Sequence, residues 1–307
     1  MDTILILTQA LNGLQLGVML FLMAAGLTLV FGIMNLINLA HGALYMAGAY
    51  LAAAAYGWTG SFLAAVALAV AGTAALGAAI ELAALRGLYR RDHLDQVLAT
   101  FGLILFLNEA ARLVWGPAAL FVPVPAALAH TVAILPGVPY PAYRLAIIAV
   151  GVAVAGGLYL LIARTRLGML IRAGASNRTM VAALGVDVGL LYTAVFALGA
   201  GLAALAGAMA APILSVEPGM GEPILILTLV VIVVGGIGSI RGAFAGALLI
   251  GCVDTIGRAF LPSMLRAVLA PSASAAVGPA LASMLIYLTM AVVLALRPRG
   301  LFAARTG

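Results

Sequence analysis

The chain has no lysine, a single cysteine and few charges of either sign, and each shortage excludes a class of function. All 15 basic residues are arginine. A phosphate-binding P-loop needs the lysine of its GK[ST] motif, so this chain does not itself carry that nucleotide site. The lone Cys252 excludes an intrachain disulfide and a multi-cysteine metal site, and we interpret it as a small packed apolar residue. Charged residues are only 8% of the 307 positions, about a third of what soluble domains carry.

In their place the chain has long apolar runs. Hydrophobic residues make up 65% of it and the mean hydropathy is +1.24, more than a soluble core can bury. No charge occurs between Thr3 and Ile80. The pattern predicts an all-α fold, a polytopic integral membrane helix bundle of about eight to nine membrane segments, some broken or re-entrant. The apolar segments lie near residues 11–33, 41–57, 61–86, 95–115, 144–164, 188–211, 223–237, 242–260 and 280–297.

The arginines predict an orientation because they gather at the ends of apolar segments. The three groups are Arg86, Arg90 and Arg91; Arg164, Arg166, Arg172 and Arg178; and Arg297, Arg299 and Arg305. The positive-inside rule places all three in the cytoplasm, which explains the net charge of +6 without nucleic acid. The amino terminus is then outside, loop 165–187 inside, the proline-rich loop 116–143 outside as an extended cap, and the carboxyl terminus inside. A second outer stretch, 261–279, also contains prolines.

The chain is predicted to be a single transmembrane domain, residues 1–307, because no change of composition marks a soluble domain. Its acidic first turn and the absence of a clear cleavage site predict that the first helix is not a removable signal peptide.

Glycines interrupt one span and are spaced for close packing in others. Segment 223–237 is short for a bilayer core and runs into GGIGSIRGAFAG. We interpret it as a broken or re-entrant helix, which is tolerated only when buried in protein or lining a wet cavity. GxxxG spacing occurs at Gly13/Gly17, Gly185/Gly189 and Gly242/Gly246. Close helix packing is the expected reason, and hinges for a conformational cycle are the alternative.

Polar side chains between the first two segments are candidates for the transport pathway, because polar groups in hydrocarbon are costly. Asn35, Asn38 and His41 lie in NLINLAHG. A role in the pathway and a turn or hydrogen-bonding strut at the inner end of the first helix are equally open.

Acidic residues in the spans predict ion pairs rather than catalysis. Glu109 and Arg112 are three residues apart and Asp254 and Arg258 four apart, which favours intrahelical pairs. Glu81 precedes Arg86 by five, a poor α-helical register, so we expect Glu81 to find a partner on another helix or to face the inner interface. No Ser/His/Asp set, paired carboxylates or HExxH motif occurs, so no catalytic residue is predicted.

Four motifs in order, spread over nearly the whole chain, carry a family resemblance. NLINLAHGALYMAGAY, LATFGLILFLNEAARLVWG, RTRLGMLIRAGASNRTMVAALGVDV and VVGGIGSIRGAFAGALLIG resemble the LivH-type permeases of branched-chain amino acid ABC transporters. The resemblance implies a multi-pass subunit of the bacterial inner membrane that forms the translocation path, is not an enzyme and holds no cofactor or metal. The implied partners are a second related permease in a heterodimer, two cytoplasmic ATP-binding subunits, a periplasmic solute-binding protein and membrane lipid.

The resemblance also implies that inner loop 165–187 couples the chain to the ATPase. Ser176 is a suitable N-cap and Gly185 a suitable stop for a short helix on which Met180, Val181 and Leu184 form an apolar stripe. The alternative is a helix that lies on anionic lipid. The candidate coupling residues are Arg166, Gly168, Arg172, Asn177, Met180, Ala182, Leu184 and Gly185.

The two polar or glycine-rich interruptions are the predicted translocation path or gate. Its candidate residues are Asn35, Asn38, His41, Gly235, Gly236, Gly238 and Ser239. Two other classes stay open: an ATP-independent channel or secondary transporter for a small polar solute such as urea or an amide, and a membrane enzyme built around His41. Against the first, no second half repeats the first and no ladder of carboxylates occurs.

Overall fold

The computed structural model describes residues 3–36, 38–89, 91–135, 138–267 and 269–302. Within these residues, each of the nine predicted apolar segments forms a helix of 15 residues or more. These helices are α1 (Thr3–Met34), α2 (His41–Thr59), α3 (Phe62–Ile80), α4 (His93–Trp115), α5 (Ala142–Arg164), α8 (Val188–Ala210), α9 (Gly221–Gly235), α10 (Ile240–Leu265) and α11 (Pro271–Leu296). Seven of the helices are long and apolar enough to cross a membrane, and α9 is a shorter apolar helix. The predicted all-α membrane bundle is confirmed.

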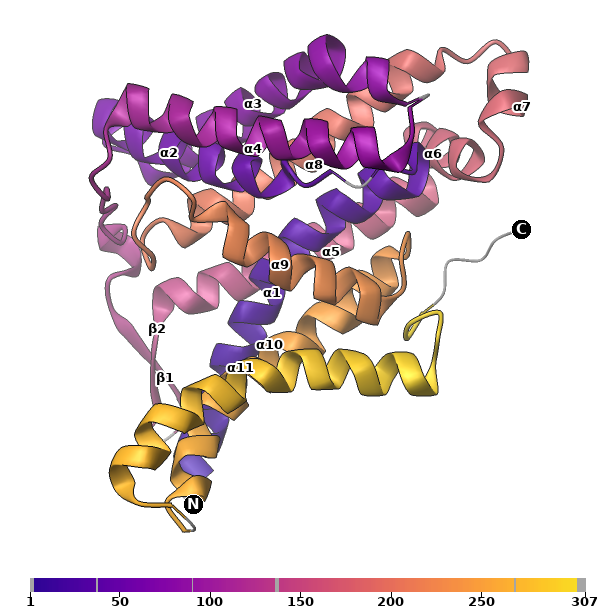
Figure 1. Cartoon of the computed structure of the whole chain (residues 1–307). Helices are drawn as coiled ribbons and strands as arrows, with labels where there is room; N and C mark the ends of the chain where they lie inside the picture. The colour runs from indigo at the N-terminus through magenta and orange to yellow at the C-terminus, as the bar shows by residue number, and fades with distance from the viewer. Residues whose placement is uncertain (1–2, 37, 90, 136–137, 268, 303–307) are drawn as a thin grey trace.

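Helix α1 runs through the middle of the bundle and the other helices pack around it (Figure 1). It packs against α10 and α8, and also contacts α5 and α9. On its far side from α10, helices α2, α3 and α8 pack on one another, while α11 packs on α10. The side chains of Leu20, Phe21, Leu22 and Met23 in α1 are at most 1% exposed. The core therefore follows α1 from Val18 onward, whereas Ile4, Leu5 and Ile6 at its start are exposed.

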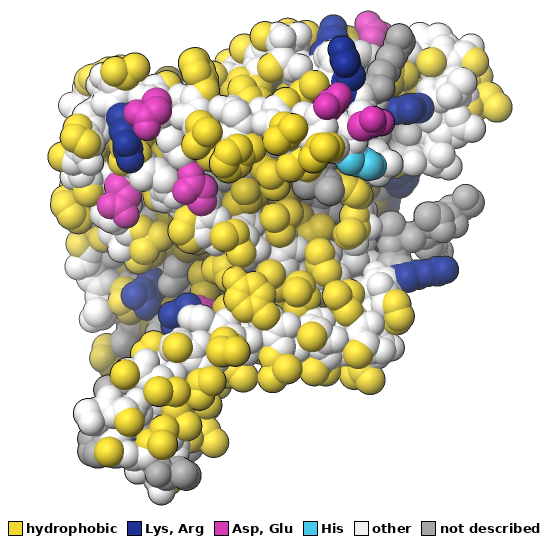
Figure 2. Space-filling model, viewed as in Figure 1, with side chains coloured by type: hydrophobic (Ala, Val, Ile, Leu, Met, Phe, Trp, Pro, Cys, Tyr) yellow, Lys and Arg dark blue, Asp and Glu magenta, His cyan; other side chains and the backbone are white. Residues whose placement is uncertain are grey.

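The peripheral helices expose apolar side chains. Figure 2 shows hydrophobic side chains over most of one face, with charged side chains near its edges. On α4, Leu98, Leu105 and Phe106 are each more than half exposed. A contiguous apolar surface of this kind is unfavourable in water and matches contact with lipid hydrocarbon.

The two ends of the bundle differ in charge. One end, here called the basic face, carries the 3-10 turn η2 (Arg86–Leu88), the helices α6 (Arg166–Ser176) and α7 (Arg178–Ala183), and the tail 297–302 (Figure 1). The other end, the hairpin face, carries the antiparallel strands β1 (Thr131–Leu135) and β2 (Val138–Pro141). The arginine groups lie together on one face, although Arg90 and Arg305 are outside the described residues. Which face meets the cytoplasm remains a prediction.

The proline-rich segments differ in how they fold. Loop 116–143 is mainly extended, with one 3-10 turn, η3 (Ala126–Leu128), before the hairpin. Stretch 261–279 was expected to separate two helices, but α10 continues to Leu265 and α11 begins at Pro271. Pro271 is tolerated because it occupies the first turn of α11, where its missing N–H has no partner to lose, whereas Pro262 and Pro279 lie inside α10 and α11. Most of the stretch is therefore helical, and its place outside the membrane stays a prediction.

Close glycine packing is confirmed at two of the three predicted pairs. A Cβ on Gly13 would lie 2.9 Å from Cα of Cys252, and one on Gly17 would lie 2.9 Å from the carbonyl oxygen of Ala247, so α1 and α10 touch through their backbones. Gly242 and Gly246 bring α10 equally close to α9. The pair Gly185/Gly189 was predicted wrongly: Gly185 lies in a turn with φ +84° and open space around it.

Candidate functional site

Helix α6 is held to the end of α5 by a cap and a close glycine contact. The Thr165 hydroxyl accepts a hydrogen bond from the Gly168 N–H at 3.1 Å, and a side chain at Gly168 would overlap the backbone carbonyl of Leu161. Ile171 is buried toward the bundle, while Arg166 and Arg172 are exposed on the other side. The helix is thus amphipathic, with its arginines turned to solvent.

Helix α7 follows at once, and its start differs from the prediction. Asn177, not Ser176, is the N-cap: its side-chain oxygen accepts from the Met180 N–H at 3.0 Å, while Ser176 ends α6. Gly185 ends the segment as predicted, because its N–H bonds to the Ala182 carbonyl and the next N–H reaches the Val181 carbonyl, a Schellman pattern.

The three residues of the predicted apolar stripe on α7 differ in exposure. Val181 is buried, whereas Met180 and Leu184 are 59% and 76% exposed. Ala182 and Gly185 are exposed as well. Helices α6 and α7 lie at the outer limit of the basic face (Figure 1), so these apolar side chains point away from the bundle.

A buried carboxylate anchors the basic face. Glu81, 0% exposed, accepts hydrogen bonds from the Tyr89 hydroxyl and the Thr193 hydroxyl, both at 2.6 Å, and lies 3.5 Å from Nε of Arg86. Burial and the hydrogen bond to Glu81 raise the pKa of Tyr89, so its hydroxyl stays a donor at neutral pH.

The expectation for Glu81 and Arg86 is therefore partly wrong. Residues 81–85 form a π-helical turn (η1), in which the N–H of Arg86 bonds to the Glu81 carbonyl. A π-turn places residues five apart on the same face, so the two side chains meet after all. The predicted partner on another helix also exists and is Thr193 of α8. The predicted pairs Glu109/Arg112 and Asp254/Arg258 are confirmed at 3.2 and 2.7 Å.

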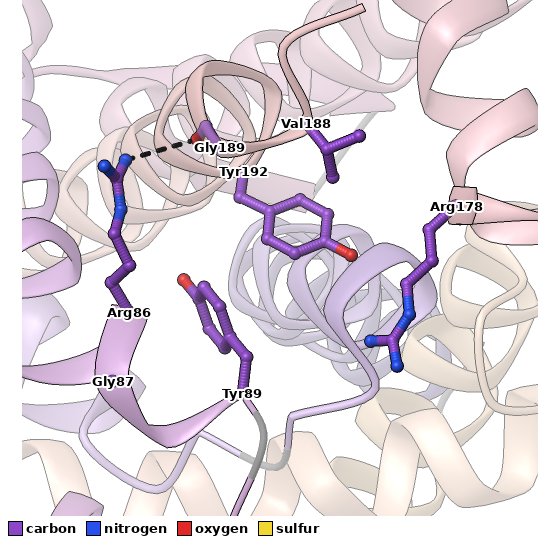
Figure 3. A pocket seen from close by; sticks show the side chains of 7 residues that line it. All are labelled: Arg86, Gly87, Tyr89, Arg178, Val188, Gly189 and Tyr192. Atoms are coloured by element: carbon purple, nitrogen blue, oxygen red, sulfur yellow. Dashed lines mark hydrogen bonds between the residues drawn. The ribbon is translucent and has the colours of Figure 1, made fainter. Parts of the chain in front are cut away.

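A groove of about 620 Å³ lies between η2, α7 and the start of α8. Arg86 donates to the Gly189 carbonyl at 3.4 Å on one wall, and Arg178 extends from α7 on the other (Figure 3). Between them the rings of Tyr89 and Tyr192 meet edge to face, with centroids 5.2 Å apart. The groove is thus lined both by the predicted coupling segment and by the start of α8, which Thr193 bonds to Glu81.

The NLINLAHG corner reaches the interior of the bundle. Asn35 has φ +55°, and the Asn38 side-chain oxygen accepts from the Ala40 N–H at 3.1 Å, so these two residues shape a turn. His41 is 0% exposed, and neither ring nitrogen has a hydrogen-bond partner among the described residues. A Cβ on Gly26 of α1 would lie 2.9 Å from the His41 ring and 2.7 Å from the carbonyl of Gly199, the middle of α8.

Helix α2 therefore begins inside the bundle rather than at the inner end of α1. Helix α9 begins beside it: Gly42 and Gly221 are in backbone contact, so that a side chain on either would overlap the other's carbonyl oxygen. Helices α2 and α9 thus begin next to each other inside the bundle, whereas the interruption predicted for segment 223–237 was at its glycine-rich end.

The GGIGS segment lies elsewhere, at the basic face. Gly236 and Gly238 have φ of +106° and +80°, and the Ser239 hydroxyl caps α10 by accepting from the Gly242 N–H at 3.1 Å. The tail docks here, since the N–H of Phe302 bonds to the Gly235 carbonyl at 2.9 Å. The structure does not bring this segment to His41; it faces the end of α1, where Gly238 is the nearest neighbour of Gly32.

Seven helices of the described residues that are long and apolar enough to cross a membrane define a multi-pass membrane protein. A model of the family described as "Branched-chain amino acid transport system / permease component" matches residues 9–294, and the chain belongs to this family of inner-membrane proteins.

Curated relatives agree with this assignment. The chain is 33% identical to the high-affinity branched-chain amino acid transport system permease protein BraD of Pseudomonas aeruginosa, over 82% of this chain and 86% of BraD. It is 28% identical to the corresponding LivH of Escherichia coli K12, over 83% and 87% of the two chains. A probable LivH of Methanocaldococcus jannaschii is also 28% identical, over 80% and 79%. No solved structure matches the chain.

Proposed function

We propose that this chain is the membrane permease subunit of an ABC importer for branched-chain amino acids. The observation that carries the proposal is the family match over residues 9–294, together with relatives named as high-affinity permeases for these solutes. The described helices supply what a permease needs, namely a lipid-facing surface and helix starts inside the bundle.

The proposed partners are those that the resemblance to ABC permeases implies. Without a lysine it has no P-loop of the GK[ST] type, so two separate cytoplasmic ATP-binding subunits hydrolyse ATP. A second related permease completes the membrane part as a heterodimer, and a periplasmic solute-binding protein delivers the substrate.

The coupling contact is segment 165–187. Arg166, Arg172 and Asn177 are exposed in the same segment as the exposed Met180 and Leu184, and an apolar projection in a segment that also carries arginines suits a groove on a soluble partner. Closure of the ATP-binding subunits pushes α6 and α7. Since α7 leads into α8 within a few residues, and α8 packs against α1, α2 and α3, the displacement reaches the helices around His41.

The gate is the place where α2 and α9 begin. His41, Gly42 and Gly221 are packed so closely that a shift of α8 changes their separation. Asn35 and Asn38 form the turn that leads into α2. At the basic face, α9, α10 and the tail are held together by Gly235, Gly236, Gly238 and Ser239.

The test is ATP-driven leucine uptake by the reconstituted complex in vesicles. Truncating the projection by Met180→Ala with Leu184→Ala is expected to lower substrate-stimulated ATP hydrolysis and uptake about tenfold, since a few apolar anchors dominate most interfaces. Leu113→Ala, an equally exposed leucine on α4, is the matched control and leaves both unchanged.

Unchanged coupling in the double variant would remove the docking role. Leucine uptake by the isolated chain without ATP would replace the importer by the channel or secondary-transporter alternative.

A further inference from the structure

A cavity of about 250 Å³ lies inside the bundle toward the hairpin face. Its walls come from α1, the beginnings of α2, α5 and α9, the segment after α8, and α10. Most of the wall is aliphatic, and the polar side chains in it are Asn12, Gln15, Tyr45, Arg144 and Thr255. At about 30 Å³ for each water, the space matches a single small solute rather than a peptide.

Arg144 is a cation without a counter-charge at this cavity. Its Nη1 donates to the Asn12 side-chain oxygen at 2.5 Å, and the Tyr140 hydroxyl donates to the same oxygen at 3.1 Å. No ion pair of the described residues includes Arg144, and no acidic side chain lines the cavity. A guanidinium can bind a carboxylate through two parallel hydrogen bonds, and here only a neutral amide engages it.

Tyr45 supplies an independent indication of a polar ligand. Its side chain is 1% exposed and lines the cavity, yet its hydroxyl has no hydrogen-bond partner among the described residues. An unsatisfied buried hydroxyl destabilises a protein by about 1–3 kcal/mol, and a solute with a polar group in the cavity would satisfy it.

Two helices begin beside the cavity, and the start of α2 adds positive potential there because its first turn carries no acidic residue, whereas the first turn of α9 carries Glu222. Tyr45 and Ile224 lie within five residues of the beginnings of α2 and α9 and both line the cavity. Neither Ala40 nor Met220, the N-cap residues, offers a side-chain cap. The first N–H groups of a helix and its dipole favour an anion, and interrupted helices in transporters use this for substrate carboxylates.

We propose that this cavity is a binding site for one aliphatic amino acid on its way through the bundle. Arg144 pairs with the carboxylate of the amino acid, and the Tyr45 hydroxyl hydrogen-bonds the polar groups on its Cα. The aliphatic wall formed around Leu16 and Leu20 packs against its side chain. The transport step rests on the proposed function, whereas binding of a carboxylate at Arg144 does not.

A thiol-labelling experiment tests the site without transport. Thr255→Cys in a Cys252→Ala background places the only thiol at the cavity wall of the chain, which is kept in its complex in neutral phosphatidylcholine nanodiscs. We expect an anionic methanethiosulfonate to react about tenfold faster than a cationic one because of the nearby guanidinium. Arg144→Gln abolishes this preference, while Arg144→Lys retains much of it.

Arg112→Gln, which removes an arginine already paired with Glu109 at 3.2 Å, is the matched control and leaves the ratio of rates unchanged. Leucine slows labelling and leucinamide, which lacks the carboxylate, does not. Equal rates for the two reagents, no labelling, or an unchanged ratio in Arg144→Gln overturn the proposal. Protection by phosphatidylglycerol but not by leucine assigns the anion to lipid and overturns it as well.

Measurements of leucine uptake distinguish failure of this binding site from failure of the proposed importer function. In vesicles, Arg144→Gln is expected to lower ATP-driven leucine uptake about tenfold, whereas the control Arg112→Gln leaves uptake unchanged. A wild-type complex that takes up no leucine contradicts the proposed function alone, because the labelling result stands independently. A wild-type complex that takes up leucine, with equal uptake by Arg144→Gln, contradicts this site alone.

Discussion

The groove on the basic face and the cavity near the hairpin face both contain arginine and tyrosine, but they treat the two side chains differently. In the groove, Arg86 and Tyr89 are bound to the buried Glu81, although the hydroxyl of Tyr192, which also lines the groove, has no partner among the described residues. In the cavity, Arg144 meets only an amide and the Tyr45 hydroxyl meets no partner among the described residues. A satisfied network is suited to transmit force from a docking segment, whereas unsatisfied groups are suited to receive a ligand.

The largest effect is expected from a substitution at the tightest backbone contact inside the bundle, between Gly42 and Gly221. In Gly221→Leu the new side chain overlaps the backbone carbonyl of Gly42, so α2 and α9 cannot begin together. We expect loss of folded protein, measured as the monodisperse fraction in size-exclusion chromatography. Gly57→Ala, with nothing within 4 Å of the added Cβ, is the control; normal yield of Gly221→Leu would contradict the close contact.

The network of the basic face gives the next largest effect. Glu81→Ala leaves the Tyr89 hydroxyl without its acceptor and Arg86 without its carboxylate, while the Thr193 hydroxyl keeps only the Gly189 carbonyl, which we expect to destabilise the protein by about 3 kcal/mol. Thermal unfolding in detergent measures this. Glu109→Ala breaks an exposed ion pair and should change stability by less than about 1 kcal/mol. Equal melting temperatures for the two variants would show that Glu81 is not an anchor.

The turn after α7 provides a smaller test of the basic face. Gly185→Ala places a side chain at φ +84° and should destabilise the turn by about 1 kcal/mol. Since the turn orients α7, we also expect weaker stimulation of ATP hydrolysis in the complex. Gly57→Ala, a helical glycine in open space, should instead stabilise slightly. The same sign of change in both would argue against a strained turn.

The smallest effect on stability is expected from a substitution in the cavity, which should stabilise the protein rather than destabilise it. Tyr45→Phe removes a buried hydroxyl without a partner among the described residues, so the empty protein should be stabilised by up to about 1 kcal/mol. Leucine uptake should fall severalfold in the same variant. A destabilised Tyr45→Phe protein would mean that the hydroxyl is already satisfied and would remove the distinction between the two regions.

Much of the scaffold could be predicted because hydropathy and spacing act locally. All nine apolar segments became helices, and the pairs Glu109/Arg112 and Asp254/Arg258 formed as their i,i+3 and i,i+4 spacing required. The errors arose where local geometry departs from the ordinary α-helix. A π-turn brought Glu81 to Arg86, and the boundary between α6 and α7 moved the cap from Ser176 to Asn177.

The candidate sites were less predictable. His41 was recognised as a polar group between two segments, but its depth depends on Gly26 and Gly199, which belong to two other helices. Arg144 and Tyr45 were missed altogether. Asn12 and Gln15, three residues apart on α1, were a usable signal, because two amides on one face of an otherwise apolar helix need a reason.

By itself, the sequence determined that the chain lies in a membrane as a set of helices, that its arginines gather at segment ends and that all its basic residues are arginine. These properties depend on composition and on neighbours a few positions away. Only the tertiary structure decided that α2 and α9 begin together inside the bundle and that Arg144 meets Asn12, 132 positions away, at a cavity without a counter-charge. Such contacts arise from packing between distant segments, which no local pattern encodes.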